Sequence, residues 1–260
     1  MRNLRGQRVN YDRIAHLYDE PLREHGLDPN LVQYLSERPD LQATRMRILD
    51  MGCGTGSQLS ADRREFPTPL MVGLDLFLGM LRQAQKRAPG LAWVQGDSAR
   101  APFQDDCFDY ITNQFSYPHV QGKAGMVAEI YRILKPGGRF VMTHIDPWSM
   151  ADWIVYRYFP AARKRDFEDF WPVEEFKERL EAAGFKHIQA SREYQSKKEN
   201  LKEFREYAWQ RYRTSQLMVL SEEDYQAGLA KIEQDLGKGG QDRAVDSELC
   251  LVTIRGDKER

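Results

Sequence analysis

The segment of this sequence best suited to chemistry is Leu49 to Gly56, LDMGCGTG, in which three glycines alternate after an apolar stretch. Glycine at the turn from a buried strand into a helix permits positive φ and lets a ligand press against the backbone. Asp75 ends the next apolar stretch, 25 residues after Asp50. A carboxylate at that strand end can accept hydrogen bonds from both hydroxyls of a ribose. Together these features predict a site for an adenosine-containing cofactor without deciding which one.

Three further features narrow the choice. The glycines fall at Gly52, Gly54 and Gly56, so the G-x-G-x-x-G spacing of a dinucleotide site is absent. The stretch GDSARAPF follows the third expected strand and places Asp97 to accept from an adenine amino group. The stretch LKPGGRFVMTH predicts the end of a helix, a tight turn and a strand.

In this combination the sequence resembles the class I S-adenosylmethionine-dependent methyltransferases. The resemblance is strongest to the small-molecule group that includes the ubiquinone and menaquinone C-methyltransferases. It covers about Tyr11 to Ile145, extends to the AGF at Ala183 to Phe185 and is weak elsewhere. It implies S-adenosyl-L-methionine as cofactor, S-adenosyl-L-homocysteine as product, and no metal.

The resemblance also implies roles for individual residues. Asp50 and the glycine loop would hold the methionine end of the cofactor, Asp75 the ribose, and Leu76 one face of the adenine. Asp97 and the Ser98 backbone would hold the adenine edge. Three residues at the end of the fourth strand would flank the methyl group, and two N-terminal tyrosines would close over the cofactor. The full set is Tyr11, Tyr18, Asp50, Gly52, Cys53, Gly54, Gly56, Asp75, Leu76, Asp97, Ser98, Asn113, Gln114 and Phe115. Cys53 belongs to it only as a small residue within the loop.

The candidates for a general base are His119 and His144, with Tyr117 behind them, because each histidine lies near the carboxyl end of an expected strand. Each histidine is also compatible with a hydrogen-bonded loop position, which is the more common role. A basic run, Arg157, Arg163, Lys164 and Arg165, could receive an acidic group on the acceptor or could be solvated surface charge.

Apolar runs that alternate with helical periodicity predict an α/β fold with a Rossmann-like, seven-stranded, mostly parallel sheet, helices on both faces and helical cap insertions. The expected strands are Met46–Met51, Leu70–Asp75, Leu91–Gln95, Phe108–Asn113, Gly138–Ile145, Phe185–Ala190 and Glu248–Ile254. The expected helices of the sheet domain are Asn10–Asp19, Pro29–Glu37, Thr55–Arg64, Gly79–Arg87, Lys123–Leu134 and one from Pro172 to Gly184.

We expect one methyltransferase domain over residues 1–260, with a helical segment at 1–40 lying over the cofactor. An aromatic-rich insertion is expected at 147–171, where it could form the acceptor pocket. A second cap at 197–240 contains two amphipathic helices, with Ser221 and Asp224 spaced as a capping box. Gly237 to Gly240 is the stretch expected to be flexible.

Composition limits the classes of partner. The 260 residues hold 38 basic and 39 acidic side chains, so no global field favours nucleic acid or an anionic membrane. No apolar stretch is long enough for a membrane span. Three cysteines, Cys53, Cys107 and Cys250, fit neither a disulfide framework nor a local metal site, which favours a reducing, cytoplasmic setting. The expected partner is a small, partly apolar molecule, and the chain a monomer or homodimer.

Two alternatives remain beside methyl transfer to oxygen, nitrogen or carbon of such a molecule. A cofactor-binding pseudo-methyltransferase would act as a scaffold without turnover. A nicotinamide-dependent dehydrogenase would use the same fold, and the glycine spacing disfavours it. Neutral charge and the lack of an RNA-binding module weigh against an RNA substrate.

Overall fold

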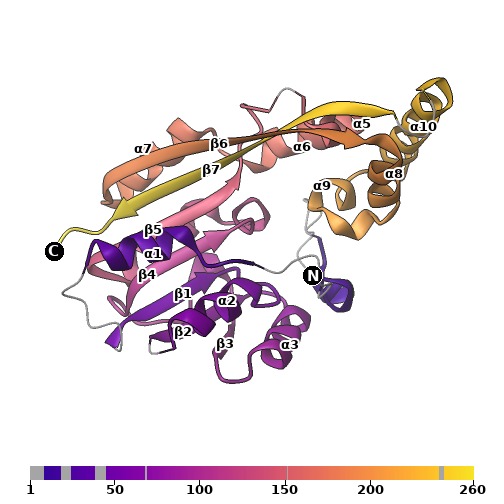
Figure 1. Cartoon of the computed structure of the whole chain (residues 1–260). Helices are drawn as coiled ribbons and strands as arrows, with labels where there is room; N and C mark the ends of the chain where they lie inside the picture. The colour runs from indigo at the N-terminus through magenta and orange to yellow at the C-terminus, as the bar shows by residue number, and fades with distance from the viewer. Residues whose placement is uncertain (1–8, 19–24, 39–44, 68, 151, 240–242) are drawn as a thin grey trace, which may run out of the picture. The chain divides into compact units, whose positions relative to one another are not determined.

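The computed structural model describes residues 9–18, 25–38, 45–67, 69–150, 152–239 and 243–260 (Figure 1). The chain divides into two compact units. Of the described residues, unit 2 contains those within Asn10–His144, Val173–Ser191 and Thr253–Arg260, whereas unit 1 contains Val9 and those within Ile145–Pro172 and Arg192–Val252. The predicted cofactor residues all belong to unit 2.

The described chain forms a seven-stranded sheet in the order β3-β2-β1-β4-β5-β7-β6, which confirms the predicted Rossmann-like, mostly parallel sheet. The strands are β1 (Arg47–Met51), β2 (Leu70–Asp75), β3 (Ala92–Gln95), β4 (Phe108–Gln114), β5 (Leu134–Ile145), β6 (Lys186–Asn200) and β7 (Ala244–Asp257). Neighbours from β3 to β5 pair in parallel, so the ends of β1, β2 and β4 lie at one edge. Strand β7 runs antiparallel to β5, because Gly137 bonds Lys258 and Thr143 bonds Thr253.

Among the helices of unit 2, a capping residue marks the start of α1 and a glycine with positive φ marks the end of α7. They are α1 (Pro29–Ser36), α2 (Ser57–Glu65), α3 (Leu78–Arg87), α4 (Lys123–Ile133) and α7 (Val173–Ala183). Asp28 caps α1 by accepting from the Asn30 N–H at 2.9 Å, and Pro29 occupies the first helical position. Helix α7 ends at Gly184, which has φ +107° and lies so close to the Tyr131 ring that a Cβ would be 2.7 Å from it.

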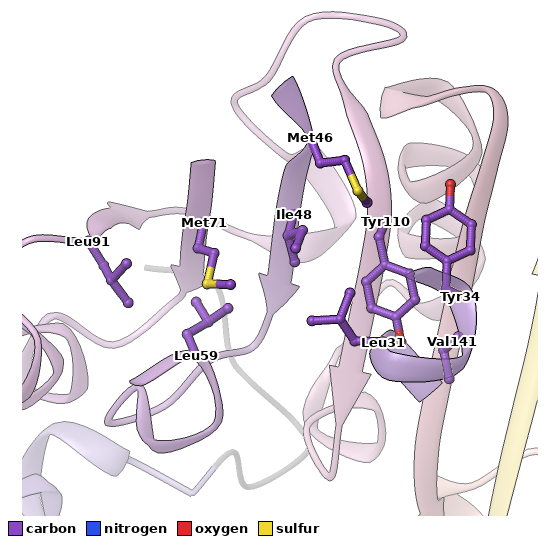
Figure 2. Packing of buried hydrophobic residues seen from close by; sticks show 9 residues of the cluster. All are labelled: Leu31, Tyr34, Met46, Ile48, Leu59, Met71, Leu91, Tyr110 and Val141. Atoms are coloured by element: carbon purple, nitrogen blue, oxygen red, sulfur yellow. The ribbon is translucent and has the colours of Figure 1, made fainter. Parts of the chain in front are cut away.

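A hydrophobic cluster fixes α1 and α2 against the sheet. Figure 2 shows Tyr34 of α1 beside Tyr110 of β4, and their ring centroids are 5.3 Å apart. Leu59 of α2 lies near Met71 of β2 in the same view. The members are Leu31, Tyr34, Met46, Ile48, Leu59, Met71, Leu91, Tyr110 and Val141. Because these residues are at most 8% exposed, the cluster holds the strands whose carboxyl ends carry the predicted site.

The predicted helix over Asn10–Asp19 is wrong within its described part. The chain instead forms two 3₁₀ turns, η1 (Tyr11–Arg13) and η2 (Ala15–Leu17), and Asp19 lies outside the described residues. Asn10 caps the first turn by accepting from the Asp12 N–H, and Ile14, with φ −116°, separates the two. The apolar spacing that predicted a helix therefore reflects side chains on two short turns.

Three strands extend several residues beyond their predicted bounds. Strand β7, predicted over Glu248–Ile254, runs from Ala244 to Asp257. Strand β6 continues beyond Ala190 to Asn200, and nearly all of its side chains are exposed. Strand β5 begins at Leu134, but its register against β4 shifts between Leu134 and Arg139, and Gly137 has φ +81°, so the Pro-Gly-Gly stretch, predicted as a tight turn, is an irregular part of the strand. Gly237, expected in a flexible stretch, lies in the last turn of α10, whereas Gly240 is outside the described residues.

Unit 1 gathers the helices of both predicted insertions. They are α5 (Ile154–Tyr158), α6 (Pro160–Asp169), α8 (Leu201–Trp209), α9 (Ser215–Met218) and α10 (Glu222–Gly239), with the 3₁₀ turn η7 (Arg211–Arg213). Phe159 packs against Phe204 and Tyr225, with ring centroids 6.4 and 6.0 Å away. The Ser221 hydroxyl accepts from the Asp224 N–H at 3.0 Å and so caps α10. Tyr212 lies beyond the end of α8, in η7.

Candidate active site

The glycine loop forms the turn between β1 and α2. Gly52, Gly54 and Gly56 have φ of +86°, +54° and +72°, a region that glycine enters at little cost. The N–H groups of Gly52 and Cys53 both donate to the Leu74 carbonyl, at 2.7 and 3.0 Å. These bonds fasten the turn to the end of β2, one residue before Asp75.

The three glycines serve different purposes. A Cβ at Gly52 would collide with Ser116 Oγ, and one at Gly56 would collide with the Trp93 ring. A Cβ at Gly54 would meet no atom within 4 Å. Gly52 and Gly56 are therefore required by packing of the protein itself, and Gly54 is the position where the backbone borders open space.

Asp75 is engaged by the backbone on both carboxylate oxygens. Its Oδ2 accepts from the Gly54 N–H at 2.9 Å, and its Oδ1 accepts from the Phe77 N–H at 2.8 Å. Burial raises the pKa of this carboxyl, and the two backbone bonds oppose that rise. Each oxygen keeps a second lone pair, so the predicted ribose contact is compatible with an additional role in closing the glycine loop.

Asp50 combines burial with an oxygen that lacks a partner. The residue is 3% exposed, and Oδ1 has no hydrogen-bond partner among the described residues. Burial raises the pKa of Asp50 well above its usual range, and the nearby Asp62, Asp28 and Asp75 add to the rise. A buried carboxylate with an unused acceptor is costly for the protein and suits a cationic group such as an ammonium. This observation fits the methionine end of S-adenosylmethionine.

A buried acidic network lies within electrostatic reach of Asp50, and the sequence analysis did not anticipate it. Asp62 Oδ1 accepts from the Asp28 N–H at 2.9 Å and from Gln58 Nε2 at 3.0 Å. The Tyr110 hydroxyl donates to Asp28 Oδ2 at 3.1 Å. Burial raises the pKa of Asp62 to about 6. Asp62 of α2 and Asp28, which caps α1, are therefore joined by a hydrogen bond.

Asp62→Asn is expected to stabilise the protein at neutral pH. The carboxyl's folded pKa is raised from 3.8 to about 6, so its stabilising contribution exists below pH about 4 and is lost as pH rises through about 6. Asparagine keeps the oxygen that accepts from Asp28 and Gln58 and removes the charge. We expect a gain of up to about 3 kcal/mol at pH 7.5 and none at pH 4. Urea unfolding at both pH values measures it, and a loss of stability at pH 7.5 would contradict this account.

The end of β4 is bonded to the end of β1. Asn113 Nδ2 donates to the Met51 carbonyl and to Ser116 Oγ, both at 2.6 Å. Asn113 Oδ1 accepts from the Tyr117 N–H at 3.2 Å, and Ser116 Oγ donates to the same Met51 carbonyl at 3.1 Å. Asn113 is completely buried. It therefore positions the turn next to Gly52, together with Ser116, which the sequence analysis missed.

The structure brings Tyr11, Tyr18 and His119 together. The Tyr11 hydroxyl lies 3.0 Å from His119 Nε2, and the Tyr11 ring meets those of Tyr18 and Phe77 edge-on at 5.7 and 5.4 Å. Asp12 Oδ1 accepts from the Gly79 N–H at 2.6 Å, which fastens the N-terminal turns to the start of α3. Removal from water, with a smaller effect of Lys123, lowers the pKa of His119 to about 4. His119 is therefore a neutral imidazole at physiological pH.

Part of the chain is similar to known methyltransferases. Residues 49–142 match the family model described as a methyltransferase domain. A demethylmenaquinone methyltransferase of Beutenbergia cavernae is 31% identical over 146 residues, which are 52% of this chain and 60% of that protein. Residues 49–142 are therefore similar to a methyltransferase domain.

Solved structures share the fold of this chain. A putative methyltransferase from an antibiotic biosynthesis pathway of Anabaena variabilis superposes with a TM-score of 0.67 at 19% identity, over 87% of this chain and 96% of that one. Phosphoethanolamine N-methyltransferase 2 of Haemonchus contortus, in complex with S-adenosyl-L-methionine, gives 0.60 at 20% identity, over 97% and 59%. The chain spans about half to two thirds of the curated relatives' length, 60%, 62% and 52% for three of them.

Two of the predicted base residues, Tyr117 and His144, are buried. Tyr117 and His144 are 0% and 2% exposed, and their rings stack with centroids 5.5 Å apart. Phe176 of α7 meets the Tyr117 ring edge-on at 5.0 Å. The structure thus brings Tyr117 and His144 together as packed side chains, and His119 is the base candidate that we carry forward.

The remaining predicted residues line the strand ends. Asp97 Oδ1 accepts from the Ala99 N–H at 3.0 Å and caps η5 (Ser98–Arg100). Gln95 Nε2 donates to the Leu76 carbonyl at 3.1 Å, so Leu76 is linked to the end of β3. Gln114 is half-buried at the end of β4. Their predicted contacts with adenine and the methyl group stay predictions.

Cys53 is buried, and burial raises the pKa of its thiol well above the usual range. The neutral thiol packs beside Gly73, where a Cβ would lie 2.7 Å from Sγ. This environment suits a small apolar side chain and not a nucleophile.

Within the described residues, no helix is long and apolar enough to cross a membrane.

Proposed function

We propose that this protein binds S-adenosyl-L-methionine and transfers its methyl group to a small, partly apolar metabolite by in-line displacement. The observation that carries the proposal is the buried, unpartnered Asp50 oxygen at the end of β1, one residue from the glycine loop. The match of residues 49–142 to a methyltransferase domain and the shared fold support the proposal.

Each residue of the site would bind a different part of the cofactor. Asp50 Oδ1 would accept from the α-ammonium, and the open side of Gly54 would admit the methionine portion. The free lone pairs of Asp75 would accept from the ribose hydroxyls, and Asp97 and Ser98 would hold the adenine edge. When bound, the cofactor supplies a sulfonium methyl group that is already a strong electrophile. The protein's contribution is alignment, which can supply about 7 to 11 kcal/mol.

A proton must also leave the acceptor if it is a hydroxyl or an acidic carbon. We assign this task to His119 Nε2, reached through the Tyr11 hydroxyl 3.0 Å away. The acceptor's proton passes to the Tyr11 oxygen while Tyr11 gives its own proton to His119. The His119 pKa, lowered to about 4, keeps the imidazole deprotonated in the physiological range but also makes it a weak base, so the proton transfer depends on the alignment of Tyr11 with His119.

Tyr11→Phe and His119→Gln are each expected to lower kcat by about 100-fold or more, in line with the usual contribution of a general base. The double variant should lose little beyond either single one, because both residues serve the same proton transfer. The wild-type rate should fall only as pH approaches about 4, since the base works when deprotonated. Single-turnover rates from pH 4 to 8 measure both effects. A fast Tyr11→Phe variant, or an acid limb near pH 6.5, would contradict the relay.

The direct test of the function is turnover. Methyl-labelled S-adenosylmethionine is incubated with the protein and a panel of small hydroxyl, amine and carbon acceptors, including a demethylated menaquinol, the substrate class named for the Beutenbergia cavernae relative. We expect label transfer to one class together with formation of S-adenosylhomocysteine. Tight cofactor binding with no transfer to any member would favour the scaffold instead.

A further inference from the structure

Phe115 is an outlier of the backbone. Among the described residues three that are not glycine have positive φ: Asp106 at 52°, Phe115 at 54° and His187 at 52°. Aspartate and histidine enter this left-handed region several times more often than other residues, whereas an aromatic ring with a bulky Cβ substituent rarely does. Phe115 therefore needs a cause that the other two do not.

The surrounding bonds fix this conformation. The Phe115 N–H donates to the Thr143 carbonyl of β5 at 3.0 Å. Asn113 before it and Ser116 after it are both bonded to the Met51 carbonyl at the end of β1. The backbone of residue 115 is thus held from both sides, and the strain cannot relax.

The ring gains little from this arrangement in the free protein. Phe115 is 46% exposed, so the unfavourable backbone is not offset by burial of the side chain. A single exposed apolar residue is ordinary, and a strained backbone can serve packing. Strain and exposure in one aromatic residue together indicate a function that requires the ring to face solvent or a ligand.

Phe115 lies next to the glycine loop. Its neighbour Ser116 is the residue that a Cβ at Gly52 would strike, and Asn113 Nδ2 would be 3.6 Å from the same Cβ. The residue also directly follows β4, the strand that pairs with β1. The exposed ring is therefore placed at the sheet edge where the methyl group is proposed to be transferred.

We propose that Phe115 is the platform on which the methyl acceptor stacks, and that the acceptor contains a planar, largely apolar ring. Aromatic faces favour flat ligands in offset or edge-on contact, and the fixed backbone prevents the ring from turning away. The inference rests on the proposed function, because it names the substrate class of the same site.

The test uses 2-naphthol as a planar probe and decahydro-2-naphthol as its non-planar counterpart, titrated into the full chain saturated with S-adenosylhomocysteine. The wild type should bind 2-naphthol at least about tenfold more tightly than the saturated alcohol. Phe115→Gly removes the ring and the strain together, so it should weaken 2-naphthol binding about tenfold or more and leave Tm unchanged or higher.

His187→Gly is the matched control, because it relieves a similar backbone at an exposed position of β6. It should leave 2-naphthol binding as in the wild type. Phe115→Leu, which keeps an apolar side chain on the same backbone, should lose the preference for the planar probe even if the glycine variant does not fold. Equal binding of the two probes by the wild type, or unchanged 2-naphthol binding by Phe115→Leu, would overturn the inference. Failure of the wild type to bind S-adenosylhomocysteine would instead overturn the proposed function.

Discussion

Asp50→Asn is expected to unfold at a higher temperature than the wild type and to lose most of its affinity for S-adenosylmethionine. The wild-type carboxylate is buried with Oδ1 unbonded and with other acids within electrostatic reach, so its charge destabilises the free protein. The same charge would form a charge-assisted hydrogen bond with the cofactor's ammonium. Losing that bond should cost about 1.5 to 3 kcal/mol, or roughly 10- to 150-fold in Kd. Thermal unfolding and titration calorimetry measure the two effects.

Asp62→Asn is the matched control, because it also neutralises a buried acid of this region. It should raise Tm at neutral pH and bind the cofactor as the wild type does. Wild-type cofactor affinity in Asp50→Asn would show that its oxygen has no ligand. A fall in Tm would show that the carboxylate has a structural role.

Asp75→Ala is expected to lower both stability and cofactor affinity. Two backbone N–H groups, those of Gly54 and Phe77, lose their acceptors, and each buried unsatisfied group costs about 1 to 3 kcal/mol. Relief of a buried charge offsets part of this loss. The cofactor loses its ribose contact and a well-formed glycine loop, so Kd should rise by at least about 100-fold. The opposite stability effects of Asp50→Asn and Asp75→Ala separate a ligand-directed acid from one that also closes the loop.

Asp75→Asn gives an intermediate case. Asparagine keeps one acceptor oxygen and places an amide N–H where the second bond was. We expect a smaller loss of stability and a smaller rise in Kd than in Asp75→Ala, measured by the same two methods. A folded Asp75→Ala variant with wild-type affinity would remove Asp75 from the cofactor site.

The sheet and the glycine loop could be predicted from sequence because both depend on local patterns. Strand β2 was predicted with its observed bounds, since Leu70–Asp75 is a short apolar run ending in a charged residue. The turn after β1 was predictable because alternating glycines after an apolar stretch are typical of a turn whose backbone adopts positive φ. The cap of α1 followed from Asp28 and Pro29 in sequence.

Features that depend on distant partners could not be predicted in this way. Strand β6 extends to Asn200 although its side chains are exposed on both faces, so no alternation of apolar residues marked its second half. The bonds of Ser116 to Met51 and of Asp62 to Asp28 join residues 65 and 34 positions apart. Burial of Tyr117 and His144 arises from stacking across the fold, which the strand-end position of His144 did not reveal.

The most direct test of the central claim is a calorimetric titration of S-adenosylhomocysteine into the full chain, with NAD titrated in parallel. The Asp50 oxygen, the open side of Gly54 and the Asp75 carboxylate together predict one site per chain, micromolar affinity for S-adenosylhomocysteine and no measurable binding of NAD. Tight binding of NAD with no binding of S-adenosylhomocysteine would contradict the assignment of the Asp50, Gly54 and Asp75 site to the sulfonium cofactor.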